Sequence, residues 1–199
     1  MKKWIICITV FFVTANFWAC SKEKDQPAVD SQTAATIIRP VAAGPNWRPP
    51  SDNYLVIGSV KGLKGTIVKY NKFLYRGGDI ISADGVNALK AKKIKTVISI
   101  TPTALEKKLC ASAGISLVEF PYEHSGLLPE QLDQISMLLK KVQTPLYIHC
   151  HGGNHRAGVL CLLYRQLIEH WGYNKALVEF GQLGGNLMRD YNLYSSARL

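Results

Sequence analysis

An apolar strand, a glycine-rich loop and an apolar helix follow one another without interruption in residues 145–170. The centre of this segment reads YIHCHGGNHRAG, so a thiol stands at the end of the strand and an arginine just before the helix. In open α/β sheets, ligands bind beyond the carboxyl ends of the strands, where such a loop lies. The segment therefore predicts an α/β fold with a ligand site at residues 150–156.

The rest of the chain from residue 54 repeats this alternation. Apolar runs predict strands at 54–60, 66–70, 73–78, 95–100, 115–120 and 145–149. Helical spacing of apolar residues predicts helices at 82–94, 103–114, 129–142 and 157–170. Strands that alternate with helices favour a three-layer fold, in which a mostly parallel sheet carries helices on both faces.

Turn and cap residues mark several boundaries. Asn71 is expected to form a tight hairpin turn, because asparagine tolerates left-handed backbone conformations. Ser82 is expected to cap one helix, and Thr103 with Glu106 to form a capping box at the next. Gly114 is expected to end that second helix.

The N-terminal part differs from the rest in composition. Residues 1–20 combine two lysines with a short apolar run, as a secretory signal does, and end in Cys20. The context of Cys20 resembles a bacterial lipoprotein site, which predicts lipidation, export and a membrane anchor. Plain signal cleavage and an uncleaved anchor are the alternatives. Residues 21–52 are expected to form a flexible linker, and residues 53–199 the folded domain.

The chain carries a formal net charge of +10, which suits anionic partners such as phosphate esters, nucleic acid or acidic lipids. It has no zinc-finger spacing and no RNA-binding aromatic signature, so nucleic acid is not expected. Beyond Cys7 and Cys20 it has three cysteines, too few for a disulfide framework. Cys110 and Cys161 lie in apolar helical patterns and are expected to be small core residues.

The loop itself predicts an anion site. Backbone N–H groups of residues 151–155 and a helix N-terminus would surround the anion, and Arg156 would hold two of its oxygens. The same positive field would favour a reactive thiolate at Cys150. This arrangement suits phosphoryl transfer through a phosphocysteine intermediate. A structural cysteine in a strand-helix turn is the alternative.

The sequence HCHGGNHR resembles the His-Cys-x-x-Gly-x-x-Arg signature of cysteine-dependent phosphatases, the superfamily of protein tyrosine and dual-specificity phosphatases. Residues 73–100 are similar to the start of compact bacterial and atypical dual-specificity members, and residues 162–180 to their helix pair after the loop. The resemblance covers about residues 54–188. It implies a protein tyrosine phosphatase-like fold and a phosphoric monoester hydrolase that needs no metal or cofactor.

The resemblance also implies roles for the loop residues. Cys150 takes the place of the nucleophile and Arg156 that of the phosphate-binding arginine, while His149 would orient the loop. The loop residues between them would bind substrate: His151, Gly152, Gly153, Asn154 and His155. Many members have a hydroxyl residue where this chain has Ala157, so breakdown of the phosphoenzyme is expected to be slow.

The proton donor departs from the family pattern. The family supplies an aspartate on a loop before the nucleophile, but residues 120–131 contain none. Glu123 and His124 are the candidates there. His155 could also donate a proton, bind a highly charged substrate or face solvent.

Several functions stay open at this point. A phosphorylated protein is the expected substrate, and an inositol polyphosphate or other small phosphoester is the alternative. Ala157 and the missing aspartate also allow a catalytically weak phosphate-binding protein. A sulfurtransferase fits the loop length less well. The oligomeric state is left open.

Overall fold

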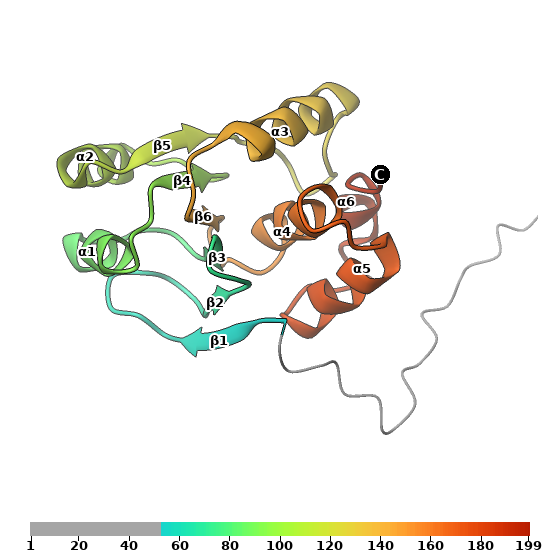
Figure 1. The fold of residues 1–199 in the computed structure, drawn as a ribbon, viewed down its shortest axis with the longest axis horizontal. Coiled ribbons are helices and arrows are strands. Elements are labelled where there is room, and N and C mark those ends of the chain that lie inside the picture. The colour runs from blue at the N-terminus through green and yellow to red at the C-terminus, as the bar shows by residue number, and fades with distance from the viewer. Residues whose placement is uncertain (1–52) are drawn as a thin grey trace, which may run out of the picture. The chain divides into compact units, whose positions relative to one another are not determined.

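The computed structural model describes residues 53–199, and these form one mixed sheet with helices on both faces (Figure 1). The strand order is β1-β2-β3-β6-β4-β5. The strands are β1 (Leu55–Gly58), β2 (Ile67–Lys69), β3 (Leu74–Gly77), β4 (Thr96–Ser99), β5 (Ser116–Glu119) and β6 (Leu146–His149). The predicted signal, Cys20 and the 21–52 linker lie outside the described residues.

The parallel part of the sheet comprises β3, β6, β4 and β5, while β1 and β2 add an antiparallel edge. One face carries α1 (Ala83–Ala91) and α2 (Ala104–Ala113). The other carries α3 (Pro129–Lys141), α4 (Arg156–Leu167), α5 (Tyr173–Gln182) and α6 (Tyr191–Ser195) (Figure 1). The predicted three-layer α/β fold is confirmed. Between residues 53 and 199, no helix is both long and apolar enough to cross a bilayer.

The side chains of the central strands point alternately into two separate hydrophobic cores. Ile98 and Ile148 belong to the core beneath α3–α6, whereas their neighbours Val97 and Tyr147 belong to the core beneath α1 and α2. Successive side chains on a strand point to opposite faces, so a strand covered on both sides is apolar over most of its length. The apolar runs in the sequence therefore predicted β4 and β6 correctly.

Two local predictions need correction. The hairpin at Asn71 does not use a left-handed backbone there; its side-chain oxygen accepts hydrogen bonds from the N–H groups of Phe73 (2.6 Å) and Leu74 (2.8 Å). Ser82 occupies the N-cap position of α1, but its side chain makes no capping bond. By contrast, Thr103 does cap α2, accepting from Glu106 N–H at 3.1 Å, and Gly114 ends it with a φ of 68°.

A buried ion pair fastens α5 to α4, the helix that begins at the predicted site. Arg165 donates from Nε to one oxygen of Glu179 (2.8 Å) and from Nη2 to the other (2.6 Å). Both side chains are almost fully buried, and the guanidinium lies 4.2 Å from the ring centre of Trp171. A buried charge that loses its partner is strongly destabilising. The pair thus holds α4 in place against α5.

Replacing Glu179 by alanine leaves the Arg165 charge buried without this partner. Because Glu169 still pairs with the Arg165 guanidinium, we expect Glu179→Ala to lower the free energy of unfolding by about 1.5–3 kcal/mol, measured by urea denaturation. The matched control is Glu119→Ala, which breaks the exposed ion pair with Lys107 and should cost less than about 1 kcal/mol. Equal losses in the two variants would contradict this account of the α4–α5 contact.

Candidate active site

The loop between β6 and α4 lies at the carboxyl edge of the parallel strands. Cys150 follows the last residue of β6, and Arg156 is the first residue of α4. Gly153 has a φ of +87°, and a Cβ there would lie 2.4 Å from the carbonyl carbon of Gly77 at the end of β3. Asp79 N–H also donates to the carbonyl of His151 at 3.3 Å. Position 153 therefore requires glycine, because the loop folds directly onto the end of β3.

Of the two residues that carry the expected chemistry, Cys150 is buried and Arg156 is half-buried. The Cys150 residue is 4% exposed. Arg156 donates from Nη1 to the carbonyl of Tyr122 (3.2 Å), while the Tyr122 hydroxyl donates to the carbonyl of Arg156 (2.6 Å). These bonds join the start of α4 to the loop at 121–128, which follows β5.

One nitrogen of the arginine lacks a partner. The Nε of Arg156 is buried and has no hydrogen-bond partner within residues 53–199. A buried donor without an acceptor costs free energy. Guanidinium donors bind phosphate oxygens in pairs, so an oxyanion at this position would satisfy the group. The geometry therefore suits a bound phosphate.

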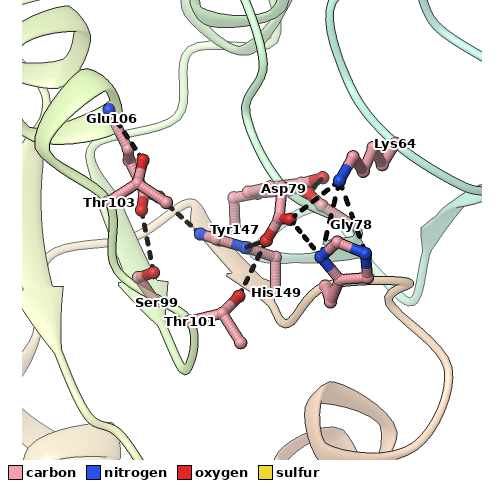
Figure 2. Close-up of polar contacts among 10 residues, drawn as sticks. Lys64, Gly78, Asp79, Ser99, Thr101, Thr103, Glu106, Tyr147 and His149 are labelled. Carbon is pink, nitrogen blue, oxygen red and sulfur yellow. Dashed lines mark hydrogen bonds and ion pairs between the residues drawn. The ribbon is translucent and has the colours of Figure 1, made fainter.

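A charged network lies beneath the loop, centred on the fully buried His149 (Figure 2). Its Nε2 lies 2.5 Å from Oε1 of Glu106 in α2, and its Nδ1 lies 3.7 Å from Oδ1 of Asp79, just after β3. Ser99 donates to Glu106 (2.9 Å) and Thr101 to Asp79 (2.7 Å). The network thus ties together β3, β4, β6 and α2.

The two carboxylates determine the charge of the imidazole. Burial by itself would lower the pKa of His149, but the nearby carboxylate of Asp79 and the hydrogen-bonded carboxylate of Glu106 outweigh it and raise that pKa. Burial would likewise raise the pKa of Asp79, yet the nearby ring of His149 and the hydrogen bonds from Thr101 and Lys64 hold that pKa well below its usual range. The network therefore favours a protonated ring one residue before Cys150. Such a positive neighbour is the environment in which thiolates form.

Sequence reasoning missed both carboxylates. Glu106 was expected to complete a capping box, but only its N–H takes part; its carboxylate is buried against His149 and Ser99. The predicted capping contact of the Glu106 side chain is therefore wrong, because that carboxylate binds the buried imidazole of His149 instead. The sequence pattern predicts no function for Asp79, although this residue directly follows the Gly77-Gly78 pair at the end of β3.

The remaining predicted residues lie around the rim of the loop. Glu123 and His124 are exposed on the 121–128 loop. The pKa of His124 is lowered by burial first and then by the charges of Arg156 and His155. His151 contacts Asp79 (2.7 Å), and His155 pairs with Asp190. Gly152 is exposed and Asn154 half-buried.

The other two described cysteines differ from Cys150 in their surroundings. Cys110 and Cys161 are fully buried in the two cores, as predicted, and no described cysteine forms a disulfide. Burial raises the pKa of Cys110 to about 11, with a contribution from Glu106, and that of Cys161 to about 12. Both are unreactive thiols at neutral pH.

A model of the tyrosine phosphatase family matches residues 69–192, which is more than half of the chain. This chain belongs to the tyrosine phosphatase family. Among curated proteins, the dual specificity protein phosphatase TpbA of Pseudomonas aeruginosa strain UCBPP-PA14 is 28% identical over 130 residues. That match covers 61% of this chain and 57% of TpbA, so the chain spans little more than half the length of this relative.

Two solved structures share the fold. TpbA of P. aeruginosa, as a cysteine-to-serine variant in complex with phosphotyrosine, gives a TM-score of 0.60 at 20% identity, covering 75% of this chain and 91% of its own. The catalytic core of the PP-IP phosphatase SIW14 of S. cerevisiae, in complex with citrate, gives 0.50 at 17% identity, covering 61% and 82%. At these identities the likeness shows the protein tyrosine phosphatase-like fold alone.

The buried network predicts a pH-dependent contribution to stability. His149 has a raised pKa in the folded protein, so its contribution is complete below the unfolded value of about 6.5 and is lost as pH rises through the folded value. Glu106→Gln should therefore lower the free energy of unfolding by about 1.5–3 kcal/mol at pH 6 and by less at pH 9.

Urea denaturation at several pH values measures this difference. The control is Glu130→Gln, which removes an exposed carboxylate in the first turn of α3 and should give a small difference that does not change between pH 6 and pH 9. A pH-independent loss in Glu106→Gln would contradict a protonated His149.

Proposed function

We propose that this protein hydrolyses phosphoric monoesters, with the Cys150 thiolate as nucleophile and a phosphocysteine intermediate. The observation that carries the proposal is the buried, unpartnered Nε of Arg156 at the start of α4, beside the loop that begins with the shielded Cys150. The family relationship supports the same chemistry.

The reaction has two steps. The thiolate attacks phosphorus, the bond from phosphorus to the leaving oxygen breaks, and that oxygen takes a proton. Water then attacks the phosphocysteine and releases inorganic phosphate and the thiolate. Arg156, the N–H groups of residues 151–155 and the N-terminus of α4 stabilise the charge on the transferring group. Ala157 offers no hydroxyl to assist the second step, so we expect that step to limit turnover.

A phosphorylated protein is the substrate that we propose first, because TpbA is named a dual specificity protein phosphatase and was solved with phosphotyrosine. An inositol polyphosphate or another small phosphoester is the second candidate. Two cationic side chains near the loop, Lys64 and Arg189, would suit a substrate with several phosphates. In addition, SIW14 is named a PP-IP phosphatase. For the proton donor, Glu123 and His124 stay the candidates on the 121–128 loop.

Replacing the nucleophile tests the proposal. We expect Cys150→Ser to reduce turnover of 4-nitrophenyl phosphate and phosphotyrosine peptide by at least about 10³-fold, measured by phosphate release with reductant and chelator present. Binding of inorganic phosphate, followed by thermal shift, should persist. Cys110→Ser, which alters a buried thiol outside the loop, is the matched control and should retain turnover. Turnover by Cys150→Ser at the level of the parent protein would contradict the proposal.

A phosphate-binding protein without catalysis is a second class of function, favoured by Ala157 and the absence of aspartate from residues 120–131. A rapid-mixing experiment separates the two classes. The hydrolase should release close to one equivalent of 4-nitrophenol in a burst, followed by slower steady turnover, whereas a binding protein should give no burst.

For the N-terminus we propose export and attachment to a membrane through lipid on Cys20, based on the signal-like pattern of residues 1–20. Metabolic labelling of the full chain with a radioactive fatty acid tests this. Label should appear in the parent protein and be absent from Cys20→Ala. Equal labelling of the two proteins, or none in either, would overturn the proposal.

A further inference from the structure

A second carboxylate–imidazole pair lies at the rim of the loop, outside the network beneath His149. His155 is the last residue of the loop, and its Nδ1 pairs with Oδ2 of Asp190, which stands just before α6. Asp190 is only 4% exposed, and the N–H of Asn186 donates to the same oxygen at 2.9 Å. The side chain of His155 is partly buried as well. The C-terminal segment therefore orients a loop imidazole through a buried acceptor.

This pair stands next to the phosphate-binding arginine, because His155 directly precedes Arg156 in the chain. The positive charges of Arg156 and His155 both lower the pKa of His124, and the charge of Asp190 acts on it in the opposite direction. These four side chains come from the 121–128 loop, the loop after β6, the start of α4 and the segment before α6. Tyr122 of the 121–128 loop contacts Arg156, and Asp190 contacts His155, so these segments meet at the end of the loop that holds Cys150.

We propose that His155, oriented by Asp190, donates the proton to the leaving oxygen, in place of the aspartate that residues 120–131 lack. This inference rests on the proposed phosphatase function. Asp190 accepts a hydrogen bond from Nδ1, which leaves Nε2 as the ring nitrogen that exchanges protons with substrate. A carboxylate that holds one ring nitrogen of an imidazole orients the other and stabilises the protonated ring. Asp190 is thus a positioning residue, and His155 is the catalytic residue.

His155 gives up one proton in the first step and regains one in the second. As Cys150 attacks phosphorus and the ester bond breaks, the leaving oxygen takes the proton from Nε2 of the imidazolium. The neutral ring then accepts a proton from the water that attacks the phosphocysteine, which restores the imidazolium. No other co-reactant is needed.

Arg189 covers this nitrogen before substrate binds. Its Nη2 lies 2.5 Å from Nε2 of His155, and its side chain is 63% exposed. A long exposed side chain is free to turn toward the phosphate of an arriving substrate, which would release Nε2. Once Arg189 has turned away, Asp190 still holds Nδ1 of the ring, so the orientation of Nε2 is kept.

Leaving groups of different basicity test the assignment, because a poor leaving group needs the proton and a good one does not. We expect His155→Asn to lower kcat/KM by less than about threefold for 2,4-dinitrophenyl phosphate and by on the order of 10²-fold for phenyl phosphate. Asp190→Asn should give a smaller, similarly directed loss on phenyl phosphate, and should move the basic limb of its pH profile to lower pH.

The control is His170→Asn, which changes an exposed histidine after α4 and should respond equally to both substrates. Retained activity on 2,4-dinitrophenyl phosphate also shows that each variant is folded. An equal loss on both substrates, or no loss on either, would overturn the proposal. The proposal would also be overturned if His124→Asn or Glu123→Gln lost kcat/KM selectively on phenyl phosphate while His155→Asn did not. All of these outcomes leave the Cys150 chemistry standing, whereas turnover by Cys150→Ser removes the proposed function itself.

Discussion

The imidazole of His149 lies out of contact with solvent between the carboxylates of Glu106 and Asp79, and this contact constrains the whole site. A buried ionised group that loses its partners costs several kcal/mol, so the two carboxylates must stay where they are. Through them, α2 and the end of β3 are held against the end of β6. The loop that begins at Cys150 starts from this point, and its position follows from the network beneath it.

The same edge of the sheet explains why the site is assembled from distant segments. Parallel strands bring their carboxyl ends together, which places residues after β3, β4, β5 and β6 around one loop. Two clusters around the loop have similar chemistry: one joins Lys64, Asp79 and His151, and the other joins Arg189, Asp190 and His155. In each, a carboxylate orients a loop histidine beside a cation. The fold supplies the phosphate loop, and these rim residues are where substrate preference would arise.

The parts of the site that the sequence predicted are contiguous in the chain. The strand, the loop and the helix around Cys150 form one local pattern, and the apolar runs of β4 and β6 follow directly from burial on both faces. Glu106 lies 43 residues from His149, and Asp190 lies 35 residues from His155. No local pattern reveals such partners. Glu106 even carries a local signal for a different role, since its spacing from Thr103 is that of a capping box. In the folded protein the Glu106 carboxylate contacts His149 and does not form the predicted cap.

The central claim is that Cys150 carries the phosphoryl group during turnover. Rapid mixing with a phosphotyrosine peptide or 4-nitrophenyl phosphate, a denaturing alkaline quench within milliseconds and mass spectrometry of the digested protein would test it most directly. The account predicts one phosphate per protein chain, located on the peptide that contains Cys150, with close to full occupancy because Ala157 slows the second step. Continued phosphate release with no phosphorylated Cys150 at any quench time would contradict it.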